Sequence, residues 1–198
     1  MSFSAAHFQT TDQVDLHYKT GKLCESNVPA IFFCHGAGAS PDQFTPQGGF
    51  AEEYCVVAPS LRGHGGSQMP DAVNTESMSL LRHALDMLEL ADHLKIKDFH
   101  FVGHSVGGLI GLEILKIAPE RILSLTVFGV SPCPKKSVFP DWLHANISHW
   151  ANFNMLQQIL GSSRSKDSAT KKAFNQMLKT ANRSAVYYML KSMVRHNY

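Results

Sequence analysis

Residues 99–111 read FHFVGHSVGGLIG, and this stretch changes character at a single serine. Its first part is rich in aromatic and β-branched residues, as a buried strand is, whereas VGGLIG opens an apolar helical pattern. Ser105 lies between the two, and the small residues Gly103 and Gly107 suit a tight turn there. The stretch therefore predicts a strand, a sharp turn and a helix, with the Ser105 hydroxyl projecting into a crevice.

The segments around this stretch alternate between strand and helix patterns. Apolar runs predict buried strands at residues 30–34 (AIFFC), 54–59 (YCVVAP) and 122–130 (ILSLTVFGV), and QVDLHYKT at 13–20 alternates as a half-buried strand does. Helices are predicted over residues 106–118 and from about residue 77 to 91, where Leu81, Leu85 and Leu88 are expected in the core. The fold class is therefore α/β, a mostly parallel sheet with flanking helices and ligands at the carboxyl ends of the strands.

The pattern changes after Val130. Residues 131–142 contain three prolines and no periodicity, and helix-like segments follow near residues 141–160, 168–180 and 184–195. We predict a core at residues 1–130 and a helical cap or lid at residues 131–198.

The composition limits the class of protein. With 198 residues, 44% hydrophobic and 17% charged, the chain has enough apolar material for one packed domain and a lid. We expect no membrane span and no secretory leader, since neither pattern is present. The four cysteines form no metal pattern, and Cys34 and Cys55 are expected to be small buried apolar residues, which favours a reducing, cytoplasmic setting.

The net charge of +2 is unevenly distributed, because residues 131–198 are strongly basic and residues 1–130 are acidic. No nucleic-acid motif accompanies the basic part, so we expect it to face an acidic neighbour rather than a nucleic acid. The expected partner is a small-molecule substrate, and the oligomeric state stays open.

Three motifs in this order resemble the α/β-hydrolase fold family. They are HGAG at residues 35–38, PSLRGHGGS at residues 59–67 and GHSVG at residues 103–107, the last matching G-x-S-x-G between a strand and a helix. The similarity covers roughly residues 10–130 and points to the cap-bearing serine branch, which includes esterases, lactonases, carbon–carbon bond hydrolases and proline iminopeptidases. Ser60 stands where the family usually has an aspartate, in a turn that is structural there.

The resemblance implies roles for particular residues. Ser105 would be the nucleophile on the elbow formed with Gly103, His104 and Gly107, and the backbone N–H groups of Ala37 and Val106 would form the oxyanion hole. His104, His35 and His64 are read as structural rather than as proton carriers. No metal and no organic cofactor is implied.

The base that would activate Ser105 is harder to find. The family's order is Ser, then Asp or Glu, then His, yet none of the later histidines follows a buried strand; they are His144, His149 and His196. We therefore expect a sequence truncated at its carboxyl end, with late strands missing and little or no activity of its own. The alternative is a non-catalytic hydrolase-like fold that binds a small molecule or a protein partner.

Overall fold

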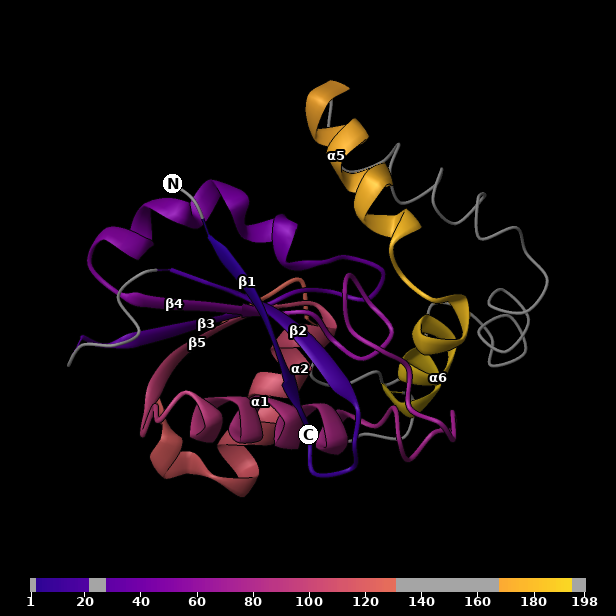
Figure 1. Ribbon diagram of the computed structural model, residues 1–198, viewed down its shortest axis with the longest axis horizontal. Helices are drawn as coiled ribbons and strands as arrows, with labels where there is room; N and C mark the ends of the chain where they lie inside the picture. The colour runs from indigo at the N-terminus through magenta and orange to yellow at the C-terminus, as the bar shows by residue number, and fades with distance from the viewer. Residues whose placement is uncertain (1–2, 22–27, 131–167, 194–198) are drawn as a thin grey trace.

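The computed structural model describes residues 3–21, 28–130 and 168–193, which form one sheet with helices on both faces (Figure 1). The sheet has six strands in the order β1-β2-β4-β3-β5-β6. β4, β3, β5 and β6 run parallel, whereas β1 and β2 are antiparallel to their neighbours. The strands are β1 (Ser4–Gln9), β2 (Asp15–Thr20), β3 (Ala30–Cys34), β4 (Cys55–Pro59), β5 (Phe99–His104) and β6 (Ile122–Phe128). The predicted α/β class with a mostly parallel sheet is confirmed.

Each face of the sheet has its own layer. The helices α1 (Leu80–His93) and α2 (Val106–Ile117) cover one face, and the 3₁₀ helix η2 (Pro41–Glu52) covers the other (Figure 1). β3 shows why, because Phe32 packs in the core cluster beneath α1 and α2 while Phe33 packs with Phe44 of η2. A strand alternates its side chains between faces, so the apolar run at residues 30–34 supplies both cores.

The buried stripe of α1 differs from the expected one. Leu81 is 42% exposed and Leu85 and Leu88 are only half-buried, so placing these three in the core was wrong for Leu81 and overstated for the other two. Ala84 and Ala91, which recur in the same sequence pattern, are fully buried, and the other fully buried apolar positions are Leu80, Met87 and Leu90. Two polar residues, His83 and Asp86, also lie on this buried face.

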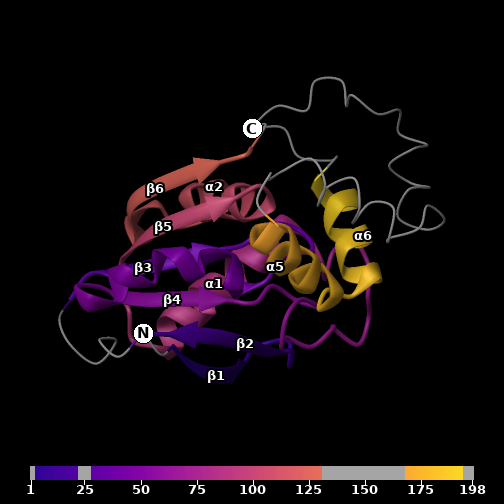
Figure 2. The ribbon, with the colours of Figure 1, turned by 90° about the horizontal axis from the view of Figure 1, so that it is seen from above.

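The two edges of the sheet are unlike each other. β1 was not anticipated; it pairs with β2 as an antiparallel hairpin and forms one edge of the sheet, with most of its residues exposed. β6 forms the opposite edge, followed in space by no further strand among the described residues (Figure 2). Three of its large apolar side chains are open to solvent, with Leu123 50%, Val127 40% and Phe128 44% exposed. The segment η3 (Pro119–Arg121) connects α2 to this strand.

The last two helices are α5 (Ser168–Lys179) and α6 (Arg183–Met193), close to the bounds expected from sequence. Both lie beyond the ends of the parallel strands, beside the arrowheads in Figure 2. Ala185 and Met189 of α6 join the core cluster, and Ser192 donates a hydrogen bond to the Met78 carbonyl at 3.3 Å. The helix expected near residues 141–160 lies outside the described residues.

The cysteines need one correction. Cys34 is free and buried, as expected, but Cys55 in β4 is disulfide-bonded although it is equally buried. A disulfide depends on a partner that is distant in sequence, so no local sequence pattern predicts it. In the described segments, no helix is both long and apolar enough to cross a bilayer.

Candidate active site

Ser105 occupies a backbone conformation that side chains rarely adopt. Its φ is 53° and its ψ is −120°, between the end of β5 and the first turn of α2. The Ser105 amide donates to the Phe128 carbonyl at 2.9 Å, which ties the turn to the end of β6. Ser105 precedes the first residue of α2, but among the described residues its hydroxyl accepts no capping hydrogen bond from that helix. Strained residues persist where the surroundings fix them, and they gather at functional sites.

Glycines make this turn possible by removing side chains from backbone contacts. A Cβ atom at Gly103 would lie 2.4 Å from the Gly107 carbonyl oxygen, and one at Gly107 would lie 2.3 Å from the Cys34 carbonyl oxygen. Both distances are far shorter than any atomic contact allows, so only glycine fits. The first turn of α2 consequently rests directly on the end of β3. We call residues 103–107 the nucleophile corner.

The loop that follows β3 comes equally close to the corner. A Cβ atom placed at Gly36 would be 3.4 Å from the Ser105 Cβ and 2.7 Å from Nδ1 of His104. The His104 ring stacks on Phe128 with centroids 5.0 Å apart, which is the packing position expected of it. We call residues 35–39 the oxyanion loop, because its backbone faces Ser105 across this gap.

Three amides of the oxyanion loop are committed to internal partners. The Gly36 amide donates to Oε1 of Gln43 at 3.2 Å, the Gly38 amide to Nε2 of His64 at 3.1 Å, and the Ala39 amide to the Gly36 carbonyl at 3.1 Å. Within the part of the chain that the structure describes, the Ala37 N–H donates no hydrogen bond. On the other side of Ser105, Val106 is the first residue of α2, and a first helical N–H has no acceptor inside its own helix. Two candidate donors thus flank the serine.

Two buried histidines hold the loop in place. His35 donates from Nδ1 to the Gly36 carbonyl at 2.8 Å and accepts at Nε2 from the Leu61 amide at 3.0 Å. His64 donates from Nδ1 to the Arg62 carbonyl at 2.9 Å and accepts at Nε2 from Gly38. Burial lowers the pKa of His35 to about 3 and the pKa of His64 to about 4, so both rings are neutral. With both nitrogens of each ring engaged, neither can serve as the base, and their structural reading is confirmed.

The turn that carries His64 is itself anchored by a buried charge. The Arg62 guanidinium is fully buried and makes two hydrogen bonds to Asp86, at 2.6 and 2.7 Å, and two to Asp12, both at 2.6 Å. Burial raises the pKa of Asp86 and the bonds from Arg62 oppose that rise, while Arg62 lowers the pKa of Asp12. The sequence pattern contained Arg62 but gave no sign of its two partners.

Ser60 fits this turn despite the usual aspartate. Its hydroxyl lies 2.9 Å from Nδ1 of His17, and its carbonyl accepts from the Ser67 hydroxyl at 2.8 Å. The Ser67 hydroxyl in turn accepts from the His17 amide at 2.9 Å. With a serine at this position, the hydroxyl and the carbonyl of residue 60 both have hydrogen-bond partners.

Helices α5 and α6 dock on the loop and on the turn. A Cβ atom at Gly38 would lie 2.7 Å from a methyl carbon of the buried Leu178 in α5, and the Asn182 amide donates to the Gly63 carbonyl at 2.7 Å. Neither Leu178 nor Gln43 was singled out from the sequence. Their contacts join segments far apart in the chain, and local patterns carry no signal for such contacts.

The base for Ser105 does not come from the described histidines around it, because His35, His64 and His104 have other roles. The candidates His144, His149 and His196 lie outside the described residues. Among the described side chains, no group of three or more His, Cys, Asp and Glu is arranged to hold a metal ion.

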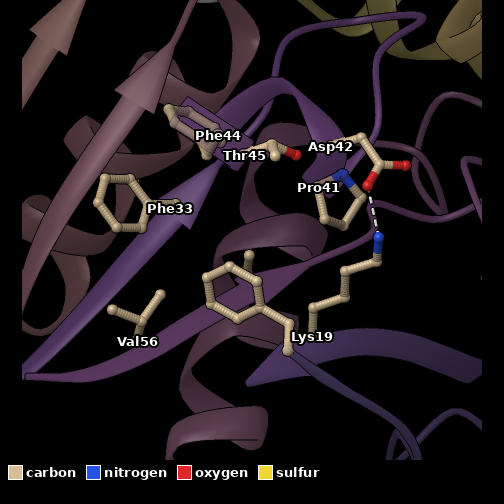
Figure 3. A pocket seen from close by; sticks show the side chains of 9 residues that line it. Lys19, Phe33, Pro41, Asp42, Phe44, Thr45 and Val56 are labelled. Carbon is tan, nitrogen blue, oxygen red and sulfur yellow. Dashed lines mark hydrogen bonds and ion pairs between the residues drawn. The ribbon is translucent and has the colours of Figure 1, made fainter. Parts of the chain in front are cut away.

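A small cavity on the η2 face lies apart from this site. It measures about 30 Å³ and is lined by apolar side chains such as Phe33, Phe44 and Val56, with the Lys19–Asp42 ion pair at its rim (Figure 3). A volume of this size holds about one water molecule, so the cavity is too small for an organic substrate.

Comparisons with known proteins agree with the geometry. The family model for the alpha/beta hydrolase fold matches residues 29–163. The chain is 28% identical over 134 residues to a "Putative esterase/lipase" of Haemophilus influenzae, covering 67% of this chain and 45% of that protein. It is 34% identical over 102 residues to 3-oxoadipate enol-lactonase 1 of Acinetobacter baylyi, covering 51% of this chain and 36% of that protein.

Among solved structures, a hydrolase from Pseudomonas aeruginosa superposes with a TM-score of 0.82 at 21% identity, covering 98% of this chain and 74% of that one. The chain spans less than half the length of the two curated relatives, the esterase/lipase and the enol-lactonase. The family match covers well over half of the chain and includes Ser105 and the oxyanion loop. The chain belongs to the α/β-hydrolase fold family.

Proposed function

We propose that Ser105 is the nucleophile of a serine hydrolase that acts on a small ester, lactone, amide or carbon–carbon bond substrate. The observation that carries the proposal is the strained Ser105 backbone, φ 53° and ψ −120°, at the start of α2 and facing the oxyanion loop. Strained backbone of this kind gathers at functional sites, and a strand–turn–helix serine within G-x-S-x-G is the context that a nucleophile requires, which supports the proposal. The relatives' names, an esterase/lipase and an enol-lactonase, fit the same reaction class.

The mechanism follows from the positions of the groups. Oγ of Ser105 attacks the substrate carbonyl carbon while a base takes its proton, and the carbonyl oxygen becomes an oxyanion held by the Ala37 and Val106 N–H groups. The intermediate collapses, the leaving group departs with a proton, and water then releases the acyl group from Ser105. No step calls for a metal or an organic cofactor.

The chain is proposed to turn over substrate poorly by itself, because the described residues provide no imidazole and carboxylate beside Ser105. Losing the base of a triad costs on the order of 10⁴–10⁶ in turnover, and the remaining acceleration comes from the oxyanion hole and binding. The same observation keeps a non-catalytic binding role as the second candidate.

Hydrolysis of p-nitrophenyl acetate tests this part of the proposal. The wild-type chain and Ser105→Ala are expected to show rates within a few-fold of each other, both above the buffer rate, because the backbone donors survive in both. A burst and a turnover far above Ser105→Ala would place a base within the 198 residues. His144, His149 and His196 would then be the residues to replace.

The compartment stays a prediction. The expected cytoplasmic setting assumed cysteines that are not oxidised, whereas disulfides are rare there and the Cys55 disulfide favours an oxidising environment. Alkylation of free thiols before and after reduction, on protein taken from its native source, decides between the two.

A further inference from the structure

His64 reaches from one loop of the site to another. It belongs to the turn after β4, yet its Nε2 accepts the Gly38 N–H of the oxyanion loop at 3.1 Å. Its other ring nitrogen donates to the Arg62 carbonyl at 2.9 Å, so the ring can adopt only one orientation and one tautomer. The side chain is fully buried.

The bonded amide is next to the candidate oxyanion donor. Gly38 has a φ of +74°, which turns the chain sharply just after Ala37. The Ala37 N–H belongs to the peptide between Gly36 and Ala37, and the Gly36 carbonyl of that peptide accepts from the Ala39 amide and from Nδ1 of His35. The next peptide joins Ala37 to Gly38. Among the described residues, its N–H group, that of Gly38, donates to His64.

We propose that His64 is a positioning residue of the oxyanion hole: by accepting the Gly38 N–H it anchors the chain directly after Ala37, so that the Ala37 backbone, and with it the Ala37 N–H, keeps its place opposite Ser105. The inference rests on the proposed function of Ser105. His64 touches neither the serine nor the substrate and acts through the backbone. A misplacement of about 1 Å in such a group can cost on the order of 100-fold in rate.

The surroundings of His64 keep it a neutral acceptor. The nearest ring is His35, with centroids 5.4 Å apart, and His83 of α1 also acts on it electrostatically. The charge of Arg62 in the same turn is directed at Asp12 and Asp86 rather than at the ring. Burial and His83 favour the neutral ring, and a protonated Nε2 could no longer accept from Gly38.

Leu178 completes the arrangement from the cap side. Its side chain is 3% exposed and lies against Gly38, at the residue whose amide His64 holds. Water is thereby kept from competing for the Gly38 N–H. The loop is held by a hydrogen bond on one side and by apolar packing on the other.

Three variants separate positioning from general loss of structure. His64→Ala removes the acceptor, His64→Gln replaces it with an amide oxygen, and His83→Ala is the matched control. His83 is also fully buried and neutral, with the pKa lowered to about 4, but it bonds only the Ser79 carbonyl of its own helix. The residual hydrolysis of p-nitrophenyl acetate is measured for each folded protein.

His64→Ala is expected to lower kcat by about 10- to 100-fold with little change in KM, because the oxyanion is stabilised only in the transition state. His64→Gln recovers most of the loss, and His83→Ala keeps the wild-type rate. The proposal is overturned if His64→Ala matches wild type, or if His83→Ala loses as much.

A second measurement needs no activity and no variant. Scalar coupling across the hydrogen bond, between the Gly38 amide nitrogen and Nε2 of His64, is expected in the wild-type chain. If wild type shows no hydrolysis above buffer, the proposed function fails by itself, and this coupling then decides whether His64 holds the loop. Absence of the coupling overturns the inference.

Discussion

The oxyanion loop and the nucleophile corner lie against each other but are held by different forces. The loop at residues 35–39 is fixed by side-chain hydrogen bonds, made by its own His35 and by His64 and Gln43 of other segments. The corner at residues 103–107 is fixed by close backbone packing that only glycine permits. The loop backbone is thus held by directional bonds, whereas the Ser105 hydroxyl makes no capping bond in its own turn.

The difference has a consequence for sensitivity to conditions. Hydrogen bonds to neutral imidazoles depend on protonation, so the loop side of the site responds to pH. Steric packing of glycine does not titrate, so the contacts of Gly103 and Gly107 change only when atoms are added there. Each of the following changes tests one of these two ways of holding the site, the hydrogen bonds of the loop or the packing of the corner.

Acid is expected to have the largest effect, and it acts through three buried rings, of which His35 and His64 hold the loop and His83 lies in α1. The pKa of His35 is lowered to about 3 and those of His64 and His83 to about 4, against about 6.5 in an unfolded chain. The unfolded chain therefore binds more protons, and stability is full above about pH 6.5 and falls as the pH falls toward about 4. At pH 5 the loss is about 2 kcal/mol for each of the three rings.

Denaturant unfolding between pH 7 and pH 4.5 measures this loss. The slope of unfolding free energy against pH gives the number of protons taken up on unfolding. This number is expected to be smaller by about one in His64→Gln than in wild type. A slope that is the same in both proteins would mean that His64 is not buried as a neutral ring.

Gly107→Ala is expected to have the next largest effect, and it acts on the corner. The new Cβ would lie 2.3 Å from the Cys34 carbonyl oxygen, and because both partners are backbone, neither can turn aside. We expect a loss of roughly 3 kcal/mol in unfolding free energy, at the upper end for overpacking. Gly49→Ala in η2 is the control, since a Cβ there meets nothing within 4 Å. Equal stability of the two variants would refute the packing account of the corner.

Ser105→Gly has the smallest expected effect and the opposite sign. Glycine adopts φ 53° and ψ −120° without strain, so the variant should unfold with about 1 kcal/mol more free energy than wild type. Ser79→Gly is the comparison, because Ser79 caps α1 through a bond from the Arg82 amide, and its loss should cost a few tenths of a kcal/mol. A destabilised Ser105→Gly would show that the serine is there for structure.

The sequence predicted most of what depends on local patterns. The strand at residues 30–34, the turn at Ser105 and the start of α2 at Val106 all came from changes in apolar periodicity. The exposed face of α1 was misjudged because the burial of Asp86 depends on Arg62, 24 positions away. Leu178, Gln43 and the Cys55 disulfide were missed for the same reason, since each contact joins segments that only the fold brings together.

Covalent labelling tests most directly the claim that Ser105 is a nucleophile facing an oxyanion hole. The folded chain is treated with a fluorophosphonate, with and without added imidazole as an external base, and the modified peptide is located by mass spectrometry. We expect slow labelling at Ser105 that imidazole accelerates, and none in Ser105→Ala, because the serine lacks only a proton acceptor. If the folded chain stays unlabelled in imidazole, or is labelled equally in Ser105→Ala, the claim is contradicted.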